Sequence, residues 1–398
     1  MTTFDPAAPL AAAPDPWHET DAPSRRSAPP YHMTDMIAAE PFVAERVLAR
    51  FADPQGPAGR LAGAIGQATT SGTPVIVTGC GTSEHGAQGI ALMIREALRA
   101  GGLPSGPSTV LAAQAFELAL DPPTGGLVIG VSHEGGSVAT IDALEAAADG
   151  GAKTALITAS AGSPAADAAG PDLILETVEL DHGWCHTIGY LSPLLAGAAT
   201  GAQLSGSPLD PGIVRGLLAT GARDEAGAEK MASALGDAST LLIVGSGADR
   251  PAARELALKI EEAAWLPSTM RDLETLLHGH LPATDGSTGL VLILTDRDGR
   301  AERVDRARQA LTAAQVIGLR AGAIVSRDID ALIDSDLTPA GRLVVDEAPE
   351  LPAPVAALIG SVTPLQLLTE RIARARGTNP DLIRREDPVY RSAADAAG

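Results

Sequence analysis

Two side chains in the second half of the chain have the types and spacing needed to move protons. Glu262 lies in a stretch with helical periodicity, "PAARELALKIEEAAWL" (251–266), and His278 follows sixteen residues later in "LLHGHLP". A carboxylate can take a proton from carbon, and imidazole titrates near neutral pH, so the pair is suited to acid–base chemistry. Two plainer interpretations stay open. Glu262 could belong to a solvated charged stripe with Glu255 and Lys259, and His278 could simply end a helix.

A glycine-rich loop, "SHEGGS" (132–137), carries a second group of polar side chains. It follows a predicted strand at 127–131, and such loops usually bind anions through backbone N–H groups. Glu134 opposes that use, because a nearby phosphate would be disfavoured by about 4 kcal/mol per charge pair. We therefore expect Ser132 and Ser137 to bind hydroxyls, with His133 and Glu134 favouring a neutral or amine-bearing group. The alternative is that Glu134 faces solvent at the loop tip.

Two more segments are candidates for shaping the same site. Thr82 and Ser83 follow a predicted strand in "PVIVTGCGTS", and "DHGWCHTIGY" contains Trp184 and His186. Hydroxyls after a strand can hydrogen-bond a ligand at the sheet edge. We expect the Trp184 indole to pack against a ligand face and the His186 imidazole to bind a hydroxyl. A plain core position for Trp184 is the alternative.

The segment around Trp184 also contains ligand types that zinc accepts, namely His182, Cys185 and His186. However, Gly183 follows His182 directly, and no further ligand stands at a spacing typical of zinc sites. We therefore expect no metal here.

The elements that must position these side chains alternate between strands and helices. Apolar runs at 74–79, 126–131, 153–158, 239–245 and 289–294 each lead towards a polar loop or a helix, and further strands are predicted at 313–322 and 341–345. This alternation predicts an α/β fold of two tandem three-layer αβα sandwiches with parallel sheets, in which the second half repeats the first. Parallel sheets bind ligands beyond the carboxyl ends of their strands, where these polar loops lie.

The predicted domain order begins with a disordered, Pro- and Ala-rich tail at 1–28. A first domain at 29–215 and a second domain at 216–376 follow. A polar, proline-broken tail at 377–398 follows, and we expect it to be extended and to close over the active site.

Charge and composition exclude several classes of partner. The formal net charge is −20 and the pI about 4.7, a field that repels nucleic acid and anionic membranes. We find no apolar run of membrane-spanning length and no pattern of disulfide-forming cysteines among the two present. We expect a cytoplasmic protein without nucleic-acid or membrane partners.

Together these motifs carry a family resemblance. "CGTS" after the first strand, S-x-x-G-x-S after the second predicted strand-loop, and "ALKIEEAAWLPSTMRDLETLLHGHLPA" resemble double sugar-isomerase (SIS) domain proteins. The likeness extends over about 32–392 and is strongest to the isomerase half of glucosamine-6-phosphate synthase and to related amino-sugar-phosphate deaminases. It implies two SIS-type sandwiches and no metal or organic cofactor.

The resemblance also implies roles for individual residues. Thr82, Ser83, Ser132 and Ser137 match the positions that bind the sugar phosphate. Glu262 matches the glutamate that shuttles a proton between C1 and C2. His278 matches the histidine that helps to open the sugar ring and that a neighbouring subunit supplies, so a homodimer with composite active sites is implied.

Two departures from the family pattern bear on the substrate. Glu134 stands where the family's phosphate loop has its second serine, which puts the phosphate in doubt. The family's lysine near the C-terminus has no counterpart, and we expect the tail to close over the site with an arginine such as Arg391. The expected function is aldose–ketose isomerisation or amino-sugar deamination through an enediol or enediolamine. The alternatives are a non-catalytic sugar-binding regulator and a fructosyl-amine deglycase.

Overall fold

The computed structural model of the chain describes residues 4–13 and 26–397, and these contain two parallel five-stranded sheets. The first sheet has the order β2-β1-β3-β4-β5, and the second has the order β7-β6-β8-β9-β10. All neighbouring strands run parallel. The strands of the first sheet are β1 (Val75–Gly79), β2 (Val110–Gln114), β3 (Leu127–Val131), β4 (Lys153–Thr158) and β5 (Ile174–Glu176). Those of the second are β6 (Thr240–Gly245), β7 (Ser268–Asp272), β8 (Thr288–Leu294), β9 (Arg320–Ser326) and β10 (Gly341–Val345).

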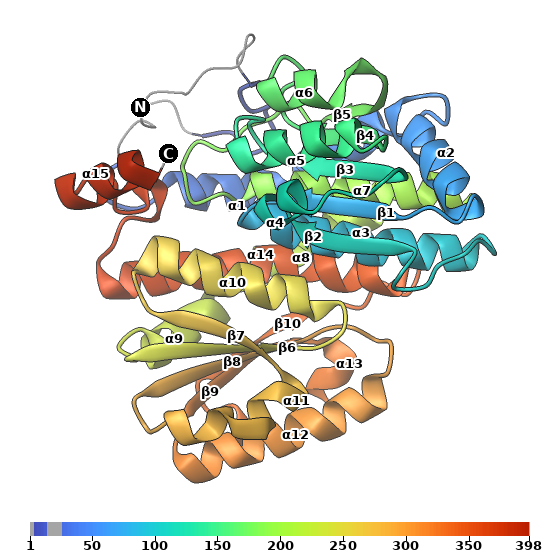
Figure 1. Cartoon of the computed structure of the whole chain (residues 1–398). Helices are drawn as coiled ribbons and strands as arrows, with labels where there is room; N and C mark the ends of the chain where they lie inside the picture. Colours follow the sequence, from blue (N-terminus) through green and yellow to red (C-terminus); the bar gives the residue numbers. More distant parts are fainter. Residues whose placement is uncertain (1–3, 14–25, 398) are drawn as a thin grey trace.

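The helices pack against both sheets and join them into one molecule. Figure 1 shows α10 and α14 in the layer between the sheets, and α10 also contacts α3. The helices of the first half are α1 (His32–Arg50), α2 (Pro57–Thr70), α3 (Thr82–Ala100), α4 (Ala115–Leu120), α5 (Val138–Asp149), α6 (Pro164–Ala169) and α7 (Ile188–Ser205). The remaining helices are α8 (Pro211–Gly221), α9 (Glu225–Leu235), α10 (Asp249–Ala264), α11 (Leu273–Thr275), α12 (Arg300–Ile317), α13 (Arg327–Asp330), α14 (Ala353–Arg376) and α15 (Pro388–Ala397).

The central strands form where the apolar runs predicted them. Every residue of β1, β3 and β8 is buried, because helices cover both faces of a parallel sheet and leave no place for a polar face. The predicted α/β class with two sandwiches is therefore confirmed. The common strand order is what an internal repeat would produce, and the repeat itself stays a prediction.

Three local predictions differ from the structure. The strand expected at 313–322 is wrong, because α12 continues to Ile317 and β9 begins only at Arg320. The boundary placed between 215 and 216 falls inside α8, which packs against both α1 and α14. The C-terminal tail is not simply extended, since it ends in the helix α15.

Part of the segment predicted as a disordered tail packs against the first domain. The Leu10 N–H donates to Oε2 of Glu179, and Ala12 forms an antiparallel bridge with Glu179. Arg46 holds the same carboxylate through an ion pair of 2.6 Å. The prediction is wrong for these residues because backbone and side-chain partners compensate the cost of ordering them. Residues 1–3 and 14–25 of that tail lie outside the described residues.

Across the described residues, no helix combines the length and the apolar character that crossing a membrane requires.

Candidate active site

A cavity of about 870 Å³ opens at the carboxyl ends of β1 and β3. It is lined by the loops of the first domain, by the end of α10 from the second domain, and by the C-terminal tail. Ten of the eleven predicted site residues line it: Thr82, Ser83, Ser132, His133, Glu134, Ser137, Trp184, His186, Glu262 and Arg391. The structure thus brings together side chains separated by up to three hundred residues of sequence.

Glu262 lies at the edge of this cavity, at the end of a buried chain of charges. Its Oε2 is 2.6 Å from Nζ of Lys259, which in turn is 3.6 Å from Oε1 of Glu255. Lys259 and Glu255 are fully buried, whereas the Glu262 side chain is 23% exposed. The interpretation of these three residues as a solvated stripe is therefore wrong, because two of them are out of water. Glu262 is the member of the chain that faces the cavity.

The charges of this buried chain stabilise one another. Burial alone would lower the pKa of the Lys259 ammonium, but the carboxylates of Glu262 and Glu255 raise it above its ordinary value. Burial alone would raise the pKa of Glu255, but Lys259, His85 and Thr82 lower it. Thr82 donates to Oε1 of Glu255 at 3.1 Å, and His85 Nδ1 lies 2.7 Å from Oε2. Lys259 therefore stays charged and fixes the position of the Glu262 carboxylate.

The hydroxyl groups of the two strand-end loops have few partners inside the protein. Ser83 lies in the first turn of α3, and Ser137 precedes the first residue of α5 without capping it. Within the described residues, the side chains of Ser83, Ser132 and Ser137 form no hydrogen bond. These hydroxyls are available to a ligand in the cavity.

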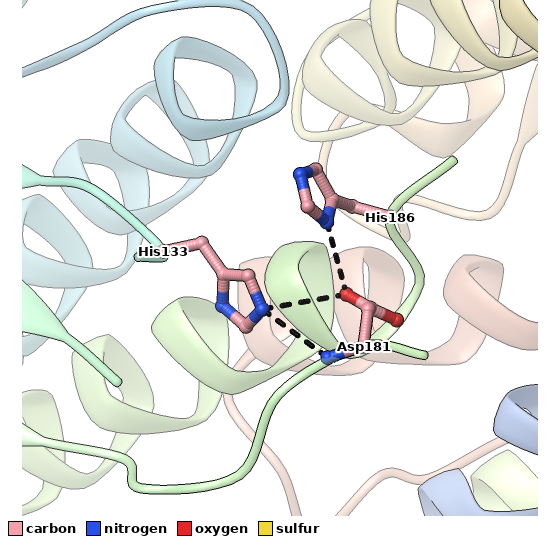
Figure 2. A group of neighbouring side chains, drawn as sticks. All are labelled: His133, Asp181 and His186. Carbon is pink, nitrogen blue, oxygen red and sulfur yellow. Dashed lines mark hydrogen bonds and ion pairs between the residues drawn. The ribbon is translucent and has the colours of Figure 1, made fainter. Parts of the chain in front are cut away.

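His133 and His186 form a cluster with Asp181, a residue that the sequence analysis did not select (Figure 2). Oδ2 of Asp181 lies 3.3 Å from Nδ1 of His186 and 3.5 Å from Nε2 of His133. Burial, together with the neighbouring His186, lowers the pKa of His133 to about 4. Burial would also lower the pKa of His186, but Asp181 raises it above its ordinary value. Burial would raise the pKa of Asp181, but its hydrogen bonds and the two histidines hold it well below the usual range.

The alternative zinc grouping of His182, Cys185 and His186 is not formed. The ring of His182 packs edge-on against His32, and Cys185 is buried. Asp181 directly precedes His182 and contacts His186 instead, so a signal for the cluster was present in the sequence. What the spacing could not show is the approach of His133 from a different strand end.

The C-terminal tail covers one side of the cavity with cationic and aromatic contacts. The guanidinium of Arg385 lies 4.5 Å from the centre of the Trp184 ring, and that of Arg384 lies between Trp265 and Tyr390. The backbone N–H of Trp184 donates to the backbone carbonyl of Asp381. Trp184 therefore lines the cavity beneath the tail and is not a plain core residue. The position of Arg391 in the lining agrees with the predicted closure of the tail over the site.

His278 is the one predicted site residue that does not line this cavity. Its side chain is 70% exposed, and its Nε2 lies 2.6 Å from Oε1 of Glu274. It follows β7 on the surface of the second domain, in a turn where His278 and Gly279 leave helical geometry. A role for His278 in this cavity requires that a second subunit supply it, which stays a prediction.

Comparison with known proteins agrees with this architecture. An isomerizing glutamine–fructose-6-phosphate aminotransferase from Methanothermobacter thermautotrophicus is 28% identical over 312 residues, which cover 76% of this chain and 49% of the relative. The chain thus spans about half the length of the curated relatives it matches. No family model matches the chain.

Solved structures extend the likeness to nearly the whole chain. The C-terminal domain of glucosamine-fructose-6-phosphate aminotransferase from Francisella tularensis has a TM-score of 0.74 at 18% identity, covering 90% of this chain and all of that domain. Tagatose-6-phosphate ketose/aldose isomerase from Escherichia coli has a TM-score of 0.69 at 17% identity, with 91% and 98% coverage. With its two parallel sheets and these likenesses, the chain has the fold of the double SIS-domain proteins, as its motifs predicted.

Proposed function

We propose that this protein is a sugar isomerase or amino-sugar deaminase that moves a proton between C1 and C2 of its substrate. The observation that carries the proposal is the position of Glu262. Its carboxylate, held by a buried lysine, faces the cavity in which the hydroxyl-bearing loops of the first domain end. A relative bears the name of an isomerizing aminotransferase and a structural neighbour that of a ketose/aldose isomerase, which supports the same reaction class.

In this mechanism Glu262 accepts the proton from one carbon and returns it to the neighbouring carbon. The ammonium of Lys259, 2.6 Å from Oε2, keeps the carboxylate in place at the cavity, where it can act as the base. The negative charge that develops on the sugar oxygen would meet Arg391 or Arg385 from the tail. Arginine keeps its charge at all relevant pH values, so it stabilises an enediolate but forms no Schiff base.

Ring opening is assigned to His278 of a second subunit, so the active enzyme is proposed to be a homodimer with composite sites. The exposure of His278 and its distance from the cavity of its own chain fit that arrangement. Glu274 pairs with the imidazole and would hold its orientation at the subunit boundary.

The preferred substrate is proposed to lack a phosphate at the loop after β3. Glu134 lines the cavity with Ser132 and Ser137, which supports a carboxylate directed at the ligand over the alternative of a solvent-facing loop tip. A carboxylate in that position disfavours a phosphate and suits a hydroxyl or an amine. This is also the feature that keeps the fructosyl-amine deglycase as a second candidate.

Isotope exchange tests the proposal directly. The protein is incubated in D₂O with free and 6-phosphorylated aldoses, ketoses and 2-amino sugars, and deuterium at C1 or C2 is measured by NMR. We expect deuterium incorporation with at least one free sugar or amino sugar, and its loss in Glu262→Gln. Release of ammonia or of a larger amine separates deamination and deglycation from isomerisation. Binding of a sugar without any exchange would show a non-catalytic sugar-binding regulator.

A further inference from the structure

The cluster of His133, Asp181 and His186 lies at the edge of the cavity and has no part in the mechanism above. Three ligand-type atoms, Nε2 of His133, Oδ2 of Asp181 and Nδ1 of His186, all lie within 4.8 Å of one another. Both imidazoles line the cavity, while Asp181 does not. One of these residues, His133, lies beside Glu134 in the loop in which this sequence departs from the family pattern.

The contacts of His133 cannot all be satisfied by hydrogen bonds. The Asp181 N–H donates to Nε2 of His133 at 3.4 Å, which requires Nε2 to carry a lone pair. The same Nε2 lies 3.5 Å from Oδ2 of Asp181, a second lone-pair atom. If Nε2 instead carries the proton, the contact with Oδ2 is satisfied but the Asp181 N–H loses its acceptor. A cation bound between Nε2 and Oδ2 removes the repulsion between these two lone-pair atoms, and it does so at the expense only of the long hydrogen bond of 3.4 Å from the Asp181 N–H.

The two distances from Asp181 Oδ2 match the spacing of a coordination shell better than that of hydrogen bonds. Zinc ligands lie at about 2.0–2.2 Å from the metal, which places ligand atoms of a tetrahedron roughly 3.4 Å apart. The two distances from Asp181 Oδ2 are 3.3 and 3.5 Å. Both are longer than the 2.7–2.9 Å of a charge-assisted hydrogen bond between an imidazolium and a carboxylate.

The chain also supplies the outer contacts that orient a metal ligand. Oδ1 of Asp181 accepts hydrogen bonds from Thr187 N, Thr187 Oγ1 and Ile188 N, at the start of α7. These bonds occupy Oδ1 and leave Oδ2, which accepts one from Gly189 N, facing the two imidazoles. Gly189 is required here, because a Cβ at this position would lie 2.9 Å from the His133 ring and 3.2 Å from Oδ2.

We propose that His133, Asp181 and His186 form a binding site for a divalent transition metal, with Zn²⁺ as its preferred occupant. Two imidazoles and one carboxylate are ligand types that suit zinc. Three protein ligands leave at least one position open, and it faces the cavity because both imidazoles line it. That position suits a hydroxyl or carbonyl oxygen of a sugar. The inference replaces the expectation of a metal-free site, and it does not rest on the proposed isomerisation.

Binding requires Nδ1 of His186 to present a lone pair. A ring protonated on both nitrogens gives up its Nδ1 proton to solvent and keeps the Nε2–H, whereas a neutral ring moves its single proton from Nδ1 to Nε2 and releases none. The positive charge of the nearby Lys259 ammonium disfavours cation binding, whereas the negative charge of Glu134, which lines the same cavity, favours it.

The test measures metal binding without any sugar. Tag-free protein is stripped with a chelator, reloaded with ZnCl₂, freed of excess metal, and analysed for zinc by mass spectrometry. A parallel titration with Co²⁺ reports tetrahedral coordination through its visible absorption. We expect one zinc per chain and an intense Co²⁺ spectrum. Since an outer-shell partner alone is typically worth about 10–100-fold in affinity, His133→Gln and His186→Gln should each weaken Zn²⁺ binding at least a hundredfold.

His182→Gln is the matched control, because His182 lies in the same segment but outside the cluster and should leave affinity unchanged. Asp181 is not varied, since it also caps α7. His186 is 27% exposed at the cavity and its substitution should not impair folding, so it decides the outcome if His133→Gln is unstable. Wild-type protein without stoichiometric zinc, or equal Zn²⁺ affinity in all variants, overturns the proposal. Isotope exchange by the metal-free protein would leave the proposed isomerisation intact and separates the two proposals.

Discussion

The two domains each hold a cavity at the carboxyl ends of their strands, but the two cavities use their polar groups differently. The first, described above, measures about 870 Å³, and a second of about 850 Å³ lies at the ends of β6 and β8. Gly81 and Gly247, with φ of +55° and +60°, follow the first strand of each sheet. Leu92 and Glu96, which stand eleven and fifteen residues after Gly81, line the second cavity. Leu258 and Glu262, which stand at the same distances after Gly247, line the first cavity.

In the second cavity most of the charged side chains are paired with one another. Arg250 pairs with Asp272 at 2.5 Å and Arg306 with Glu274 at 2.6 Å, and Glu96 pairs with Arg99. Oδ2 of Asp296 accepts hydrogen bonds from the Ala248 N–H and from Arg303. The backbone N–H that an anionic ligand would use at this loop is therefore already occupied by a carboxylate of the protein.

The difference shows what makes one of two similar cavities a candidate active site. Both have a loop after the first strand, a crossing helix and a glutamate. Serine hydroxyls without a hydrogen bond to the described residues line both, namely Ser83, Ser132 and Ser137 in the first and Ser246 in the second. Only in the first is the glutamate held by a buried lysine. Lys259 stands twelve residues after Gly247. The residue twelve after Gly81 is Met93, which is buried and carries no charge.

The largest expected effect comes from replacing each of the two corresponding glutamates, Glu262 and Glu96, by glutamine in separate variants. Glu262→Gln removes the base but keeps its shape, and loss of a general base typically costs about 100- to 10,000-fold in turnover. Glu96→Gln is the matched control and should leave turnover unchanged, because Glu96 lies in the other cavity. Turnover is measured by isotope exchange, and thermal unfolding checks that both variants fold. Near-normal turnover in Glu262→Gln would remove Glu262 from the mechanism.

A second prediction uses the position of His278, which lies beside the second cavity of its own chain through its contact with Glu274. If it completes the first cavity of a neighbour, mixing inactive Glu262→Gln and inactive His278→Ala chains should restore activity. Roughly a quarter of the sites should recover, because half of the dimers are mixed and each holds one intact site. Mass spectrometry confirms subunit exchange. An unchanged, inactive mixture after verified exchange would mean that His278 does not act across subunits.

The sequence predicted the parts of this comparison that depend on local pattern. Central strands are uninterrupted apolar runs, so they and the polar residues directly after them could be located. Six of the predicted residues that line the first cavity come from these loops: Thr82, Ser83, Ser132, His133, Glu134 and Ser137. The edge strands β2 and β7, "VLAAQ" and "STMRD", were missed because half-exposed edge strands carry polar residues and lack that signal. Val316 suggested a strand but is an exposed residue near the end of α12.

Contacts between distant segments could not be predicted in the same way. Asp181 lies 48 residues from His133, and only the packing of β3 beside the start of α7 brings them together. Lys259 was recognised as a neighbour of Glu262 on one helix face, but its burial depends on the packing of α10 against α14 and α3. The chemistry of a buried charge is thus decided by tertiary contacts that a periodic pattern does not contain.

A third prediction concerns the anion preference of the first cavity. Glu134→Ser removes a negative charge and restores a hydroxyl donor between Ser132 and Ser137. We expect fructose 6-phosphate to bind about tenfold tighter and the unphosphorylated sugar to bind more weakly, with both shifts reduced by added salt. Glu145→Ser, an exposed position on α5, is the control for net charge. Calorimetry in the presence of a chelator measures the effect of Glu134 independently of any metal. Tight binding of the phosphate ester by wild type, with no gain in the variant, would contradict the prediction.

The smallest expected effect tests whether the carboxylate of Asp296 keeps anions from binding in the second cavity. Asp296→Ser removes the carboxylate that accepts the Ala248 N–H and pairs with Arg303. The Arg303 guanidinium and the Ala248 N–H are then left without that partner at the cavity. We expect the variant to gain weak binding of inorganic phosphate, seen by NMR or calorimetry, where wild type shows none. Because the new site would be open to solvent, its affinity should fall steeply with ionic strength. Asp298→Ser removes the same charge from the lining of the same cavity without freeing that donor, and it should gain no such binding. If the two variants bind phosphate equally, net charge alone explains the gain, and the contrast between an open and an internally closed cavity fails at this residue.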